Sequence, residues 1–71
     1  MMIERQWWNG GNGRSRRDVY IRTDGERWEV MAQVGGADGR SKVQVCPSSK
    51  AASILANAWL GSQVKWRIVK S

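Results

Sequence analysis

The residue types that carry most enzymatic chemistry are nearly absent from this 71-residue chain. It has no histidine, so it lacks the commonest general base, the commonest metal ligand and the usual activator of a serine or cysteine nucleophile. Cys46 is the only cysteine, which excludes a zinc site built from cysteine and histidine within one chain. The carboxylates Asp24, Glu26 and Glu29 cluster. A hairpin turn and a cross-strand pair with Arg22 account for them without catalysis. We expect no enzyme activity, no metal and no cofactor.

Two smaller features leave room for chemistry. Cys46 stands just before a predicted helix, where thiol pKa values fall, so a reactive thiol and a small packing residue are both open interpretations. Ser48, Ser49 and Lys50 at the helix start could hold one phosphate, and their simpler role is helix capping. The run Gly-Gly-Asn-Gly at 10–13 is not a phosphate loop, because it lacks the Gly-Lys-Ser/Thr ending.

Cationic residues are unevenly distributed along the chain, whose formal net charge is +6. Up to Gly39 the arginines and the carboxylates balance, whereas every charged residue from Arg40 to Ser71 is positive. A half-domain of one sign produces a directional field that favours anionic partners. The alternative is that the net charge only keeps a small protein soluble.

The predicted strands place an aromatic ring and most of these cations on one sheet face. Such a face is typical of sheets that bind a nucleic-acid groove or a single strand, and a basic arm adds phosphate contacts. The alternative is an ordinary solvated face whose cations prevent edge-to-edge aggregation. We expect nucleic-acid binding, to DNA in preference to RNA. The expected contact residues are Arg14, Arg16, Arg17, Tyr20, Arg22, Arg27, Arg40, Lys42, Lys65 and Arg67.

Trp7 and Trp8 are adjacent in a polar N-terminal segment, and an extended chain cannot point both rings the same way. One interpretation is packing on the domain itself. The other is that the rings anchor a protein partner, because tryptophan is enriched among the residues that dominate interface energetics. The alternative function is therefore a protein-interaction module, or a small phage or host regulatory protein. It would dock through these rings and a sheet edge, alone or as a homodimer.

The elements that position these residues follow from composition and periodicity. Residues 1–17 are predicted as a flexible or loosely packed segment, because 9–17 are rich in glycine, asparagine and arginine. Residues 18–71 are predicted as one small domain. Apolar and polar residues alternate in four stretches, which predict strands, with Val43 and Val45 inward in the third. Asp24-Gly25 predicts a hairpin with a type I′ turn. The four strands are expected at 18–23, 27–34, 40–46 and 63–70.

A helix is predicted between the third and fourth strands. Ser48 or Ser49 can cap its start, and Gly61 ends it. One apolar stripe at helical spacing is expected to face the sheet, namely Ala51, Ile54, Leu55, Ala58 and Trp59. The predicted fold class is α+β, an antiparallel sheet of three to four strands in the order β-β-β-α-β with one helix on one face. Which edge the last strand joins stays open.

The stretch from Val19 to Leu60 resembles the arm-binding N-terminal domain of tyrosine recombinases, a three-stranded sheet backed by one helix. The matching features are Asp24-Gly25 before Trp28, the Gly-Arg-Ser-Lys start of the third strand at 39–42, and the alanine-rich helix ending in Trp59-Leu60. In that family the sheet enters the DNA major groove. The resemblance implies DNA contacts from Arg22, Arg27, Arg40 and Lys42. The pattern is equally similar to small β-β-β-α-β domains of unknown function in bacteria and phages, which the additional last strand fits better.

The N-terminus and the cysteine content bear on location. The first eight residues contain Glu4, Arg5 and Gln6, so they lack the apolar run of a signal peptide. No stretch approaches the roughly 20 apolar residues of a membrane-spanning helix. A single cysteine cannot form an intramolecular disulfide. We expect a cytoplasmic protein with no membrane partner and no small-molecule substrate.

Overall fold

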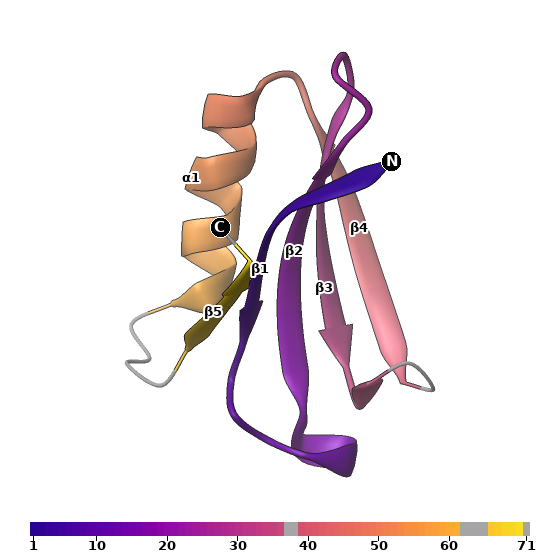
Figure 1. Ribbon diagram of the computed structural model, residues 1–71, viewed down its shortest axis with the longest axis vertical. Helices are drawn as coiled ribbons and strands as arrows, with labels where there is room; N and C mark the ends of the chain where they lie inside the picture. Colours follow the sequence, from indigo (N-terminus) through magenta and orange to yellow (C-terminus); the bar gives the residue numbers. More distant parts are fainter. Residues whose placement is uncertain (37–38, 62–65, 71) are drawn as a thin grey trace.

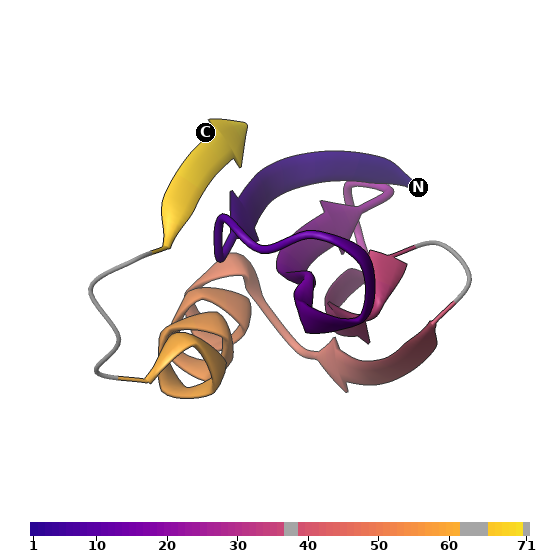
Figure 2. The same ribbon diagram turned by 90° about the horizontal axis from the view of Figure 1, so that it is seen from below.

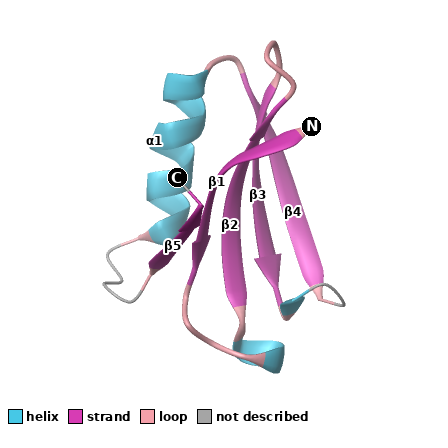
Figure 3. Cartoon of the chain, viewed as in Figure 1, coloured by secondary structure: helices cyan, strands magenta, loops and turns pink. Residues whose placement is uncertain are grey.

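The computed structural model describes residues 1–36, 39–61 and 66–70, so the predicted contact residue Lys65 lies outside the described residues. The described chain forms one antiparallel sheet with a helix on one face, which is the α+β fold class predicted from the sequence (Figures 1 and 3). The elements in chain order are β1 (Met2–Trp8), the 3₁₀ turn η1 (Gly13–Ser15), β2 (Arg17–Thr23), β3 (Trp28–Val34), β4 (Arg40–Cys46), α1 (Ser49–Leu60) and β5 (Arg67–Lys70).

Strand β1 departs most from the sequence prediction, which placed residues 1–17 in a flexible or loosely packed segment. The sheet has five strands in the order β4-β3-β2-β1-β5, and β1 pairs antiparallel with both β2 and β5. Its charged residues weaken the apolar alternation, and a register shift falls between Ile3 and Arg5. The strand is therefore defined by its two neighbours, a tertiary effect that a local pattern does not contain.

The hairpin between β2 and β3 forms where it was predicted, but its turn is different. The last ladder pair is Thr23 with Trp28, which leaves a four-residue connection. A type I′ turn needs positive φ at both central residues, whereas only Gly25 has one, at 101°. The Asp24 carboxylate instead accepts hydrogen bonds from the backbone amides of Glu26 at 3.0 Å and Arg27 at 2.7 Å. These bonds stabilise the longer turn, since aspartate readily caps nearby amides.

The core lies between the helix and the central strands. Val19, Ile21 and Val30 are buried on the helix side of the sheet, and Ala52 and Ala56 are buried beneath them on α1. Two small side chains one helical turn apart allow the helix to approach the sheet closely. Seen end-on, α1 lies against the concave side of the curved sheet (Figure 2).

The helix has the predicted bounds, but its buried stripe is rotated from the predicted one. Ser48 is the N-cap, its hydroxyl accepts a hydrogen bond from the Ala51 amide at 3.1 Å, and Gly61 ends the helix at φ 67°. Ile54, predicted to face the sheet, is 62% exposed. The buried stripe is centred on Ala52 and Ala56, and Ala51, Leu55 and Trp59 flank it partly buried.

Strand β4 has the opposite facing from the prediction. Val43 and Val45 were expected inward but are 46% and 50% exposed on the outer face. Cys46 lies opposite Trp28 and is buried against the core. Because side chains alternate along a strand, an inward Cys46 places Gln44 and Lys42 on the helix side and both valines outside.

Strand β5 joins the sheet edge formed by β1, which settles the edge left open by the sequence. Arg67 pairs with Trp8 and Ile68 with Trp7, while the predicted positions 63–65 lie outside the described residues. Trp66 packs against the core and donates from its indole nitrogen to the Leu60 carbonyl at 2.9 Å. No helix in the described ranges is long and apolar enough to cross a bilayer.

Candidate nucleic-acid interface

The outer face of the sheet, the predicted contact surface, is largely neutralised. Arg22 lies on this face, but its Nη2 donates to Glu29 Oε1 at 2.7 Å. The Tyr20 hydroxyl donates to the Gln33 side chain at 3.1 Å and is partly buried. Burial, followed by the nearby Asp18 charge, raises the pKa of Tyr20. A compensated face with an engaged tyrosine does not form the open basic platform that the sequence predicted.

Two further predicted contacts do not lie on that face. Lys42 projects on the helix side of β4, with its Nζ 4.4 Å from the centre of the Trp59 ring. Its predicted outward facing is wrong, because the register of β4 is set by Cys46. Arg27 lies in the exposed turn between β2 and β3 rather than within a strand.

The other arginines predicted as contacts lie in segments that meet at one end of the sheet. This is the lower end in Figure 1, and we call it the arginine end. Two loops meet there, since the Gly35 amide donates to the Arg16 carbonyl at 2.8 Å. The strands ending there carry arginines on both faces: Arg17 and Arg40 each flank Val34 on the helix side, and Arg67 pairs with Trp8 on the outer side. All of these arginines except Arg16 are exposed. The arginine end consists of Arg14, Arg16, Arg17, Arg40 and Arg67.

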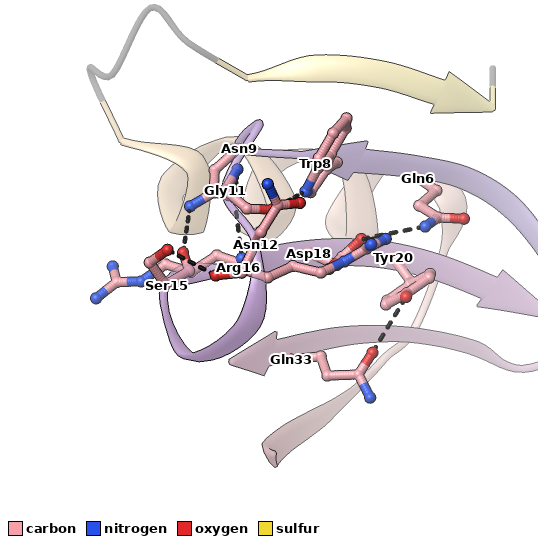
Figure 4. A network of polar contacts seen from close by, with 11 residues as sticks. Gln6, Trp8, Asn9, Gly11, Asn12, Ser15, Arg16, Asp18, Tyr20 and Gln33 are labelled. Atoms are coloured by element: carbon pink, nitrogen blue, oxygen red, sulfur yellow. Dashed lines mark hydrogen bonds and ion pairs between the residues drawn. The ribbon is translucent and has the colours of Figure 1, made fainter. Parts of the chain in front are cut away.

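The connection between β1 and β2 forms a hydrogen-bonded loop where a flexible linker was predicted (Figure 4). The Asn9 side-chain oxygen accepts from the Gly11 amide at 2.9 Å and from the Arg17 amide at 3.0 Å. The Asn9 amide group donates to the Ser15 carbonyl at 2.9 Å. A Cβ on Gly11 would lie 2.7 Å from that same carbonyl oxygen, so the loop needs glycine there. Asn9 therefore fixes the path that presents Arg14 at the loop tip.

Trp8 and Asp18 anchor the arginine end beneath the exposed guanidinium groups. Asp18 is 1% exposed and accepts from Arg16 Nε at 2.8 Å and Arg16 Nη2 at 3.2 Å. Gln6 adds a third hydrogen bond to this carboxylate at 3.2 Å. The Trp8 indole donates to the Gly11 carbonyl at 2.9 Å, and the guanidinium groups of Arg16 and Arg67 lie 5.3 and 5.7 Å from its ring centre. These distances are within the range of cation–π attraction.

The electrostatics of this end are strongly positive. The hydrogen bond to Asp18 is the largest effect on Arg16 and raises its pKa above the ordinary value. Asp18 is the only carboxylate among the described residues of this end, and its charge is already paired with Arg16. The four other arginines therefore present their charges to solvent. Sequence reasoning found these arginines individually but missed Asp18 and Trp8 as their supports, because no local pattern links them.

The other predicted partner residue, Trp7, lies on the helix side and packs against the core. With Arg5, Ile68 and Lys70 it lines a shallow hollow of about 220 Å³. Both tryptophans thus contact their own domain, one on each face of the sheet. Within the described ranges, no group of three or more histidine, cysteine or acidic side chains could hold a metal ion.

Comparisons of this chain with protein-family models, with curated proteins and with solved structures found no match. The resemblance to the recombinase domain stays a prediction.

Proposed function

We propose that this protein binds nucleic acid, DNA in preference to RNA, without catalysing a reaction, and that the arginine end is the contact surface. The observation that carries the proposal is four exposed arginines around one sheet end, where the only described carboxylate is buried and paired. Arginine suits this role because its guanidinium matches phosphate oxygens bidentately and stays charged at every physiological pH.

The support beneath the arginines favours binding over simple solubility. Arg16 is held by Asp18, and Arg67 lies against Trp8 and beside the backbone of Gly10. Arg17 and Arg40 are separated by one strand, so their backbones lie about 10 Å apart. Pre-positioned cations lose less side-chain entropy on binding phosphates than freely rotating ones. The preference for DNA over RNA rests on the sequence resemblance to the recombinase domain. We also propose a cytoplasmic location.

Fluorescence anisotropy of a labelled 20-base-pair duplex measures the binding directly. Neutralisation of phosphates by four arginines predicts a log–log slope of affinity against salt of about −3.6. An RNA duplex of the same sequence is expected to bind more weakly. No detectable DNA binding at about 50 mM salt would overturn the proposal.

Alanine variants locate the surface. Arg14→Ala, Arg17→Ala, Arg40→Ala and Arg67→Ala should each reduce the salt slope by about 1. Arg27→Ala is the matched control, because it removes another exposed arginine, at the opposite end of the sheet. Equal losses from Arg27→Ala and Arg17→Ala would show that binding is not confined to the arginine end.

A further inference from the structure

Strand β4 is an open edge of the sheet. It is the terminal strand in the sheet order and, within the part of the chain that the structure describes, pairs only with β3. Every residue from Arg40 to Val45 is exposed, and Cys46 alone is buried. Along this one-sided ladder the backbone groups of alternate residues point away from β3, and another extended segment can pair with them.

The two sides of this edge have different chemistry. On the outer side, Val43 lies next to Met31, which lies next to Tyr20, so a row of apolar side chains runs up to the edge. On the helix side, Lys42 and Gln44 alternate with the valines. An added strand would therefore place alternate side chains against an apolar row and against a cationic row.

Charge decides which kind of strand fits. From Arg40 through Leu60, which covers β4 and the whole of α1, the chain has no carboxylate. The Lys42 ammonium lies over the Trp59 ring of α1, so its charge is placed on the side of the edge that faces the helix. A second copy of β4 would add its own Arg40 and Lys42 to this space, and like charges across a strand pair are destabilising. Acidic side chains are the complement.

We propose that the β4 edge binds an extended protein segment in which acidic residues alternate with apolar ones. The acidic side chains lie on the helix side against Lys42 and Arg40, and the apolar ones lie on the outer side against Val43 and Val45. The backbone of the segment pairs with β4 and extends the sheet. This surface is separate from the arginine end except for Arg40, which both contain.

A labelled heptapeptide of alternating valine and glutamate tests the proposal with the full-length protein. We expect saturable binding with a Kd of about 100 µM and shifts of backbone amide resonances confined to β4 and the adjacent residues of β3. A peptide with lysine in place of glutamate, and one with serine in place of valine, should each bind at least about five-fold more weakly. Absence of binding at about 1 mM peptide, or shifts centred on β5, would overturn the proposal.

Substitutions separate this site from the proposed nucleic-acid surface. Lys42→Glu and Val43→Lys should each weaken peptide binding by about five-fold or more, because they alter the two sides of the edge. The control Lys70→Glu makes the same charge change on the opposite edge strand and should leave peptide affinity unchanged. Sedimentation of the free protein then measures its oligomeric state. A monomer supports the proposal, and a dimer abolished by Val43→Lys would overturn it by identifying a second copy as the occupant.

Discussion

The two ends of the sheet carry opposite arrangements of charge. At the arginine end, five arginines surround a single buried carboxylate among the described residues. The other end, which contains the turn between β2 and β3 and lies at the top of Figure 1, is the hairpin end. Its cations and carboxylates are mixed and nearly balanced. The charged residues in or next to this end are Glu4, Arg5, Arg22, Asp24, Glu26, Arg27, Glu29 and Lys50. Uncompensated arginine charge is therefore concentrated at one end of the sheet.

The two ends also use their carboxylates differently. Asp18 is buried and fixes Arg16, so its charge supports the cations around it. Asp24 is exposed and accepts the amides of its own turn, so its charge stabilises only the local backbone. The comparison teaches that formal charge alone does not define an anion-binding surface. The position of each carboxylate decides how much positive charge reaches solvent.

The largest difference between the ends is expected from loss of their paired carboxylates. Asp18→Asn removes a fully buried charge that accepts from Arg16 and Gln6, and should lower the free energy of unfolding by about 2 kcal/mol. Glu29→Gln weakens the pair with Arg22. The Glu29 side chain is 14% exposed, against 0% for Asp18, so this loss should be smaller, about 1 kcal/mol. Urea denaturation of both variants measures the difference, and equal losses would contradict the anchoring role of Asp18.

A glycine-to-alanine substitution should destabilise the protein more in the loop at the arginine end than in the turn at the hairpin end. Gly11→Ala places a Cβ 2.7 Å from the Ser15 carbonyl oxygen, so the loop must move, at a cost of about 1–3 kcal/mol. Gly25→Ala meets no atom within 4 Å, and its cost of about 1 kcal/mol comes from positive φ alone. Only Gly11→Ala should also weaken DNA binding, because its loop carries Arg14. Unchanged affinity in Gly11→Ala would separate the loop from the binding surface.

The smallest expected effect is the pH response of the hairpin end. Hydrogen bonds from the amides of Arg27 and then Glu26 lower the pKa of Asp24 below its ordinary value of 3.8. The folded-state pKa is depressed, so this stabilisation is present above pH 3.8 and is lost as the pH falls through the folded-state value. Thermal melts from neutral to acidic pH should show a smaller decrease in Tm for Asp24→Asn than for the natural protein. A parallel decrease in both would exclude this contribution.

The sequence predicted the elements with strong local signals. The cap at Ser48, the terminator at Gly61 and the Asp24-Gly25 hairpin all lie where they were expected, because short-range hydrogen bonds and backbone preference determine them. The same local arguments failed for the facing of Val43 and Val45. The alternation along that strand favours inward valines, because its other side carries Arg40, Lys42 and Gln44. Contact of Cys46 with the core selects the opposite facing.

The sequence predicted the individual arginines of the candidate site but not that they lie together on one surface. Arg14, Arg16 and Arg17 come from the half of the chain that balances its charges, and Arg40 and Arg67 come from the purely cationic half. Their assembly depends on β1 entering the sheet and on β5 pairing beside it. Neither pairing leaves a local pattern, because each depends on residues far apart in the chain.

The sequence by itself determined the composition of this protein's chemistry: no histidine, one cysteine, an excess of arginine and lysine, and an α+β succession of elements. Those properties depend on residue type and short-range periodicity. Only the tertiary structure decided where the charge emerges. Strand pairing compensates Arg22 on the sheet face and turns Lys42 toward the helix, while it leaves four arginines exposed at one end. The physical reason is that the effect of a charge depends on the groups next to it, and the tertiary fold determines which groups those are.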